Sequence, residues 1–382
     1  MKISVAMATF NGAQYLPEQL DSILRQELLP HELVVCDDSS TDETCQIIEH
    51  FANQAPFEVR LVRNIRPLQS TANFNQALSL CSGDLVFLSD QDDVWLEQKI
   101  STLSSLARSD PTNHVFMNDA EIVTDSLQRT GLTKLGQLHS AGISERKYVM
   151  GCTAAIRGAF LKQVLPVPEA YRGHDSWIIQ IAEGLGVRRI VRESLQLYRR
   201  HGGNVSQFVA NQTVRVGRLA YLLNRVSDSF SRDDSVDLAA RLAETRAMRQ
   251  RVLEMSDSGL IREVSSAAGW QVSGIDPDPV AVSVARKRGL DAQLEGIDGT
   301  NLASTLPPTA MRDSGALADL GPEKFEVFLE RLKALEDAIQ SRALCLEKAG
   351  VGRLGSVIRL YWQGKYRQFG GLESAFRDLL VK

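Results

Sequence analysis

Short apolar runs alternate with stretches of helical periodicity over residues 1–120. The runs at 3–8, 33–36 and 85–88 are uninterrupted and bounded by polar residues, which predicts buried strands. Further strands are expected at 57–62 and 114–117. Apolar positions spaced three or four residues apart predict helices that begin near Tyr15 and end before Pro30, and at 41–51, 71–80 and about 95–107. This alternation predicts an α/β fold with a mainly parallel central sheet wound with helices.

Polar side chains follow three of the predicted strands where each strand ends. Thr9 and Asn11 follow the first strand, Asp37 and Asp38 the second, and the acidic segment 89–95 the third. In open parallel sheets, ligands bind beyond the carboxyl ends of the strands. The sequence therefore predicts a binding site where these three strand ends meet.

The acidic segment reads Ser-Asp-Gln-Asp-Asp-Val-Trp and places Asp90, Asp92 and Asp93 within four positions. Two like charges about 5 Å apart repel by about 3 kcal/mol at an effective dielectric of about 20. A cation would offset this repulsion, and carboxylate oxygens suit Mg²⁺ or Mn²⁺. The alternative is an acidic loop in which Asp92 or Asp93 caps the next helix. The segment alone leaves both interpretations open.

Composition narrows the functional classes. The 382 residues suffice for a catalytic domain and a second unit, and a net charge of −4 gives no reason to expect a nucleic-acid partner. The five scattered cysteines lack zinc-site spacing and fit a reducing compartment. No signal peptide and no apolar run of membrane-spanning length is recognised, so we expect a cytoplasmic protein.

Four motifs, in order and spacing, resemble one enzyme family: ATFNG at 8–12, VVCDDSSTD at 34–42, NFN at 73–75 and SDQDDVW at 89–95. They are similar to inverting nucleotide-sugar glycosyltransferases of the GT-A fold, nearest to the bacterial rhamnosyltransferase-like branch. The resemblance covers about residues 1–210, which implies a catalytic domain there and a mostly helical region over 211–382. It implies metal-dependent transfer of a sugar, rhamnose being one candidate, to a hydroxyl of a surface polysaccharide precursor such as O-antigen or capsule.

The resemblance assigns roles to the strand-end residues. Thr9 and Asn11 would contact the nucleotide, and Asp38 would accept a hydrogen bond from the base or ribose. Asp92 would bind Mg²⁺ or Mn²⁺ on the donor diphosphate, with Asp90 towards the ribose. The alternatives are a plain turn for Thr9 and Asn11, and an N-cap of the following helix for Asp38.

The segment GHDSW at 173–177 opens a predicted helix, where the family has an acidic general base. Asp175 is the matching residue and would take the proton from the acceptor hydroxyl. The alternative is that Asp175 only caps the helix. The resemblance also places a group of residues towards the acceptor, namely Gly151, Cys152, Thr153, His174 and Trp177.

The segment YRRHGGNVS at 198–206 matches a family segment that folds over the diphosphate. It implies His201 as a further metal ligand and Arg200 as a phosphate contact. Residues 186–225 hold eight arginines and one glutamate, which suits the diphosphate or an anionic lipid surface. A solvated helix face is the alternative for Arg215, Arg218 and Arg225.

The C-terminal half carries helical patterns at 211–255 and 325–346. Residues 348–369 interleave basic and aromatic side chains without acids, which favours peripheral attachment to an anionic membrane and would suit a lipid-linked glycan acceptor. The alternative is a basic helix packed on the core.

One stretch, residues 252–295, resembles a degenerate fragment of a class I S-adenosylmethionine methyltransferase. Asp276 occupies the position of that family's ribose-binding acid, but residues 256–259 lack the glycine pair that permits close backbone approach. A methyltransferase and a non-catalytic nucleotide-sugar binding protein are therefore the alternative functions.

Overall fold

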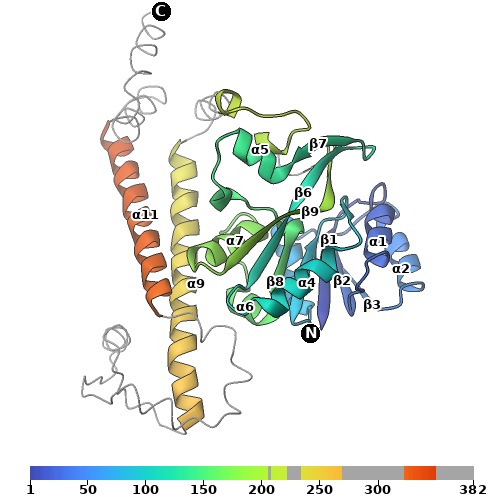
Figure 1. Cartoon of the computed structure of the whole chain (residues 1–382). Helices are drawn as coiled ribbons and strands as arrows, with labels where there is room; N and C mark the ends of the chain where they lie inside the picture. The colour runs from blue at the N-terminus through green and yellow to red at the C-terminus, as the bar shows by residue number, and fades with distance from the viewer. Residues whose placement is uncertain (205–207, 222–233, 269–321, 350–382) are drawn as a thin grey trace, which may run out of the picture.

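The computed structural model describes residues 1–204, 208–221, 234–268 and 322–349 (Figure 1). A nine-stranded sheet forms the centre, with the strand order β3-β2-β1-β4-β8-β6-β9-β5 and β7 paired to β6. Helices cover both faces of the sheet, and a long helical pair stands at one side (Figure 1).

The N-terminal half is a parallel β-α-β unit. Its elements are β1 (Ile3–Thr9), α1 (Leu16–Leu24), β2 (Glu32–Asp37), α2 (Thr44–Ala52), β3 (Glu58–Arg63), α3 (Gln69–Leu80) and β4 (Leu85–Ser89). Strands β3, β2, β1 and β4 pair in parallel, so their carboxyl ends meet at one edge.

The second part adds antiparallel strands to this sheet. Its elements are β5 (Val94–Trp95), α4 (Lys99–Ser109), β6 (Val115–Thr124), β7 (Arg129–Thr133), α5 (Lys134–Ser140), the 3-10 turns η1 (Glu145–Lys147) and η2 (Gly151–Thr153), β8 (Ala154–Arg157), α6 (Gly158–Val164), α7 (His174–Gly184), β9 (Arg188–Arg200) and η3 (Val209–Asn211). Strand β8 runs antiparallel between β4 and β6. Strand β9 pairs in parallel with β6 and antiparallel with β5, which forms the last two residues of the acidic segment.

Side-chain alternation along the strands divides the core between the two faces of the sheet. On β4, Leu85 and Phe87 join a cluster with α1, α2 and α4, while Val86 and Leu88 join a cluster with α3, α5, α6 and α7. Because β4 is buried on both faces, its sequence is a continuous apolar run. The α/β fold class expected from the sequence is confirmed.

Helices α9 (Asp234–Ala268) and α11 (Pro322–Ala349) pack against each other and against the domain near α6 and α7 (Figure 1). A Cβ atom at Gly184 of α7 would lie 2.2 Å from the Phe328 ring, so this glycine admits the phenyl group of α11. The Arg251 guanidinium donates to the Leu165 carbonyl at 2.8 Å, in the segment that leads to α7. None of the helices within the described ranges has the length and hydropathy that crossing a bilayer needs.

The structure corrects three local expectations. Residues 94–95 form β5 and helix α4 begins at Lys99, because Trp95 pairs with Gln196 of the distant strand β9. Residues 212–217 are not helical, whereas 218–221 and α9 from Asp234 are, and residues 222–233 lie outside the described part of the chain. Residues 252–268 continue α9, so the stretch 256–259 is helix and not a methionine-binding loop. The rest of the methyltransferase-like segment, with Asp276, lies outside the described residues, as do residues 350–369.

A stability prediction concerns Asp110, which joins the end of α4 to the start of β9. Burial acts to raise the pKa of Asp110, but hydrogen bonds from Arg189 at 2.7 Å and from Asn113 outweigh it and hold the pKa below its ordinary value. A lowered folded-state pKa gives stability above the unfolded-state pKa that is lost as pH falls through the folded value. We expect Asp110→Asn to cost about 1 kcal/mol at pH 7.

Chemical denaturation between pH 7 and 2 measures this effect. The difference between parent and Asp110→Asn should shrink below about pH 4. Asp21→Asn, at an exposed aspartate of α1, is the matched control and should follow the parent. A constant difference across this range would contradict the prediction.

Candidate active site

The ends of β1 and β4 are joined by a side chain. The Gln91 amide accepts from the Phe10 backbone N–H at 2.9 Å and donates to the Phe10 carbonyl at 3.1 Å. A Cβ atom at Gly12 would lie 2.4 Å from Gln91 Oε1, so glycine leaves the space for this amide. The acidic segment and the β1 loop are therefore held together, as expected from the shared sheet edge.

The pair Asp37-Asp38 at the end of β2 is engaged by protein groups. Asp37 accepts from the Thr9 hydroxyl at 2.9 Å and from the Ser40 backbone N–H at 2.9 Å. Asp38 accepts from the backbone N–H groups of Leu68 at 2.6 Å and Gln69 at 2.8 Å. Asp38 thus caps α3, and not the helix that follows it in the sequence.

Two predicted donor contacts are largely buried. The side chain of Thr9 is 1% exposed and faces Asp37, and Asp38 is 6% exposed with both carboxylate oxygens accepting from the 64–69 loop. Both side chains shape the loops around the strand ends, and their contact with a donor stays a prediction. Sequence patterns cannot show this, because the partners of Asp38 lie about 30 residues further along the chain.

Two residues of the β1 loop are open to a donor. Asn11 adopts a positive φ of 45° and its side-chain oxygen accepts from the Thr41 backbone N–H at 2.9 Å, which turns the loop outwards. Phe10 beside it is 52% exposed at the end of a buried strand. An exposed aromatic ring at this edge offers a stacking face for a base, a feature that the sequence-based assignment missed.

Asp90 and Asp93 lie together with Cys152, with ligand atoms of the three side chains within 4.8 Å of one another, whereas Asp92 faces His201. Asp93 is fully buried and accepts from the Gln196 amide at 2.9 Å and from the Arg199 backbone N–H at 3.1 Å. Burial, followed by the charges of Asp92 and Asp90, raises the pKa of Asp93 well above its ordinary value. Helix α4 begins six residues later, so the interpretation of Asp93 as its cap is wrong.

Lys99 lies behind this segment and was not singled out from the sequence. It is fully buried, and its ammonium group donates to the Cys152 carbonyl at 2.6 Å and to the Gln196 side chain. The same ammonium lies 3.9 Å above the Trp95 ring. Burial lowers the pKa of Lys99 to about 7, against the raising effect of Cys152, Asp93 and Asp90. Lys99 thereby ties α4 to the η2 turn and to β9.

Asp92 faces the turn that follows β9. Its Oδ2 lies 2.7 Å from His201 Nε2 and accepts from the Asn204 amide at 3.1 Å. The His201 ring lies 4.5 Å from the Tyr15 ring, centroid to centroid, which fixes its orientation. The structure thus brings Asp92 and His201, predicted from segments 109 residues apart, into contact. A carboxylate oxygen and an imidazole nitrogen this close can bind one divalent cation together.

Arg199 and Arg200 precede this turn and have different roles. Arg199 is 3% exposed and donates to the carbonyls of Asp92 at 2.8 Å and Asp125 at 2.6 Å, and its guanidinium lies 4.8 Å from the Tyr15 ring centroid. It therefore holds the Asp92 backbone in place. Arg200, the predicted phosphate contact, is half-buried against the Tyr198 ring next to His201.

Asp175 lies at the start of α7, within the reach of the acidic segment. Its Oδ1 accepts from the Ser176 backbone N–H at 2.7 Å, and Oδ2 has no hydrogen bond to any described residue. Its charge contributes to raising the pKa of Asp90 to about 7, after burial and after the charge of Asp92. The side chain is half-buried, so one carboxylate oxygen is fixed while the other is open.

The residues around Asp175 leave it little freedom. Gly173 has φ of 99°, and His174 stacks on Phe74 with ring centroids 3.8 Å apart. A Cβ atom at Gly151 would lie 3.0 Å from the Asp175 Cβ and 3.3 Å from His174 Nε2. Gly151 therefore permits the η2 turn to approach the start of α7.

Three of the predicted acceptor contacts are buried in the core. Cys152 is 1% exposed, Thr153 is fully buried and donates to the Met150 carbonyl, and Trp177 is fully buried and donates to the Val164 carbonyl. Their contact with an acceptor stays a prediction. Gly151 and His174 remain at the site, His174 with 8% exposure and a pKa lowered by burial.

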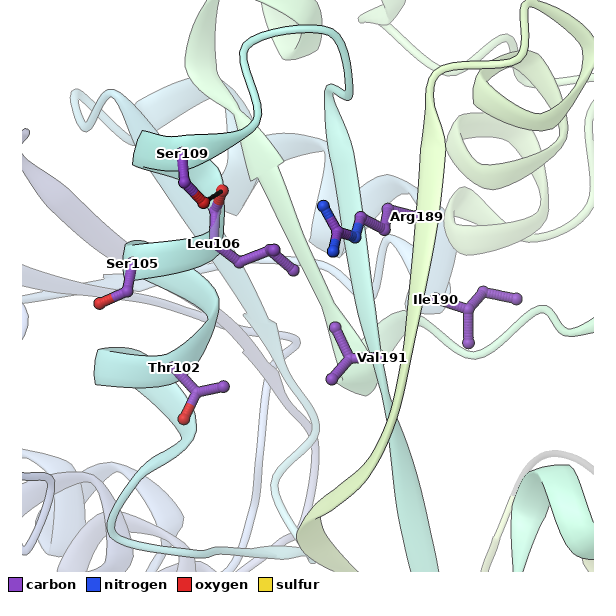
Figure 2. A pocket seen from close by; sticks show the side chains of 7 residues that line it. All are labelled: Thr102, Ser105, Leu106, Ser109, Arg189, Ile190 and Val191. Carbon is purple, nitrogen blue, oxygen red and sulfur yellow. Dashed lines mark hydrogen bonds between the residues drawn. The ribbon is translucent and has the colours of Figure 1, made fainter.

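A hollow of about 530 Å³ lies elsewhere, between α4 and the start of β9 (Figure 2). Thr102, Ser105 and Ser109 line one wall, and Arg189 and Val191 line the other (Figure 2). It holds none of the residues predicted for the site, and the acidic segment lies at the other end of α4. We assign no part of the activity to it.

Residues 4–162 match the family model "Glycosyl transferase family 2". This part of the chain is a family 2 glycosyltransferase domain. A curated relative, an uncharacterized glycosyltransferase of Nostoc sp., is 29% identical over 223 residues, which are 56% of this chain and 69% of the relative. The dTDP-rhamnosyl transferase RfbG of Shigella flexneri is 34% identical over 98 residues, which are 25% of this chain and 34% of RfbG.

Among solved structures, S. aureus TarS 1–349 in complex with UDP aligns with 87% of this chain and 92% of its own, at 14% identity and a TM-score of 0.44. The family match and the relatives confirm the prediction that the chain is a nucleotide-sugar glycosyltransferase. The matched residues 4–162 contain the ends of β1, β2 and β4 and the η2 turn. Helix α7 and the His201 turn follow them in the sequence.

Because Gly151 lies close to Asp175 and His174, a larger residue at position 151 should lower the rate of sugar transfer. In Gly151→Ala, the new methyl group must push the Asp175 and His174 side chains by a few tenths of an ångström. We expect the rate constant of transfer, kcat, to fall about ten-fold, because small displacements of reacting groups are costly. Steady-state kinetics and thermal unfolding measure the two effects separately.

The matched control is Gly217→Ala, where the added Cβ meets nothing within 4 Å. This variant should keep the parent's kcat and Tm. A Gly151→Ala enzyme with unchanged kcat would show that the η2 turn does not restrain the start of α7.

Proposed function

We propose that this glycosyltransferase catalyses divalent-metal-dependent, inverting transfer of one sugar from a nucleoside-diphosphate sugar to an acceptor hydroxyl. The observation that carries the proposal is the placement of Asp175 beside the acidic segment, where its charge acts on Asp90. On the other side of that segment, Asp92 is in contact with His201. We propose that Asp175 and the Asp92–His201 pair act on one bound donor at the carboxyl ends of β1 and β4.

Asp175 is the proposed general base. Its open Oδ2 accepts the proton of the acceptor hydroxyl while the hydroxyl oxygen bonds to the anomeric carbon and the bond to the diphosphate breaks. One such displacement inverts the anomeric configuration, and the transition state is oxocarbenium-like as in other glycosyl transfers. The hydrogen bond from Ser176 holds the carboxylate in one orientation during this step.

Asp92 and His201 are the proposed ligands for Mg²⁺ or Mn²⁺. Their oxygen and nitrogen donors suit a first-row divalent cation, and the imidazole favours Mn²⁺ over Mg²⁺. When bound, the cation neutralises the charge of the diphosphate leaving group. We propose that Asn11, Asp90 and Arg200 contact the donor and that Phe10 stacks on its base, while Gly151 and His174 border the acceptor.

Rhamnose is a candidate sugar because the chain resembles the rhamnosyltransferase-like branch and because RfbG is by name a dTDP-rhamnosyl transferase. The proposed acceptor is a glycan or lipid-linked glycan of a surface polysaccharide pathway. Residues 1–210 are the proposed catalytic domain and 211–382 a helical region. The basic segment 348–369 would support a cytoplasmic, membrane-peripheral location.

The base assignment is tested by Asp175→Asn. Asparagine stabilises a helix N-terminus as well as aspartate does, and its side-chain oxygen can still accept the hydrogen bond from the Ser176 N–H. Its amide cannot act as a base for the acceptor hydroxyl. We expect Tm to stay within about 1 °C of the parent while kcat falls about 10²- to 10⁴-fold. Transfer is measured with the donor identified by the screen described below.

The result separates the two interpretations of Asp175. A residue that only caps the helix would tolerate asparagine with no loss of kcat. Full transfer by Asp175→Asn would therefore remove it as the base. Saturable donor binding with no turnover on any acceptor, even in the parent, would favour a non-catalytic binding protein.

The metal assignment is tested by thermal shift. Nucleotide sugars with Mn²⁺ should raise the Tm of the parent, since a bound ligand stabilises by RT ln(1 + [L]/Kd). The shift should vanish with excess chelator and in Asp92→Asn and His201→Ala. Glu97→Gln, at an exposed carboxylate just before α4, is the matched control and should retain the shift. A metal-independent shift in all four proteins would contradict the assignment.

A further inference from the structure

Residues 208–221 present exposed apolar and basic side chains together. Val214 and Leu219 are 70% and 71% exposed, and Phe208 is 41% exposed. Arg215 and Arg218 are also exposed, and neither has an ion pair within the described part of the chain. The stretch contains no acidic residue. We call these five side chains the 208–219 surface.

The backbone beneath the 208–219 surface is fixed to α5. The Gln137 side chain donates to the carbonyls of Gln212 at 2.9 Å and Val214 at 2.8 Å, and accepts from the Val216 backbone N–H at 2.9 Å. The Ser140 hydroxyl donates to the Val216 carbonyl at 2.8 Å. Val216 itself is buried. The exposed side chains therefore project from an anchored loop and cannot turn inwards without breaking these bonds.

The 208–219 surface is close to the active site along the chain. Phe208 follows His201 by seven positions, which is at most roughly 25 Å of extended chain. The Lys134 ammonium, which donates to the Ala210 carbonyl and to Asn211, holds the start of the loop. Whatever the surface contacts is thus near the turn that carries His201.

The end of α11 lies on the same side of the molecule. Arg246 of α9 bonds Glu336 of α11 at 2.8 Å, and the two helices are antiparallel, so the end of α11 is opposite the start of α9. Figure 1 shows both ends on the side of α5. Ala349 ends α11 on that side, and the sequence that follows it, residues 350–369, is rich in basic and aromatic residues.

We propose that the 208–219 surface docks on an anionic lipid bilayer. Aliphatic and aromatic side chains enter the interfacial region, and arginines without an ion pair to any described residue attract anionic headgroups; this pairing is typical of interfacial membrane contacts. A groove for a protein helix would need a concave apolar site, whereas these side chains project outwards. The inference rests on the proposed function in one respect: the proposed acceptor is lipid-linked, and an enzyme docked on the bilayer would reach it.

Vesicle flotation of the full-length protein tests the proposal. The parent should bind phosphatidylcholine vesicles with about 30% phosphatidylglycerol, bind pure phosphatidylcholine poorly, and dissociate as salt rises. Arg215→Gln with Arg218→Gln should weaken binding roughly 25-fold, about five-fold for each charge. Val214→Ser with Leu219→Ser should weaken binding by a similar factor.

Matched controls change the same residue types elsewhere. Arg25→Gln with Arg108→Gln removes two exposed charges, and Val327→Ser with Leu335→Ser removes two exposed apolar side chains of α11; both should bind like the parent. No binding of the parent to anionic vesicles would overturn the proposal, as would equal loss in test and control variants. Flotation requires no donor or turnover, so a failure of the proposed catalysis would leave this result unaffected.

Discussion

The end of β4 crowds three carboxylates together, and the site is arranged around that constraint. Asp93 is buried and receives the Gln196 amide and the Arg199 backbone. Asp92 faces His201. Asp90 lies beside Asp93 and Cys152, with ligand atoms of the three within 4.8 Å of one another, and its pKa is raised to about 7. Burial and the neighbouring carboxylates raise the pKa values of both Asp90 and Asp93, as expected from the repulsion of like charges at short range.

Strand β9 supplies most of these partners, although it lies about 100 residues further along the chain. Strand β9 pairs with β5, which forms the last two residues of the acidic segment. The carboxyl end of β9 leads into the His201 turn. The buried ammonium of Lys99 links the same strand to the η2 turn. The Asp92–His201 pair and the η2 turn are therefore connected through one largely buried polar network, in which an unsatisfied group would be costly.

The sequence predicts those features that depend on short segments. The buried strands and the residue types of Asp92, His201 and Asp175 are visible in local patterns and motif order. The partners of these residues are not visible in local patterns, because they come from segments that only the fold brings together. Examples are the backbone groups that bind Asp38, the burial of Trp177 and the pairing of Trp95 with Gln196. Lys99 is missed because a lysine at the start of a helix resembles a solvated residue until tertiary packing encloses it.

The Gln91 amide exchanges two hydrogen bonds with the Phe10 backbone, as a neighbouring strand would. The Gln91 side chain thus continues the hydrogen-bonding pattern of the sheet by one residue beyond the end of β4. The β1 loop and the acidic segment consequently form one body before any donor arrives. Most of the entropy needed to order them is lost during folding, which leaves a larger part of the interaction energy for affinity when the nucleotide binds.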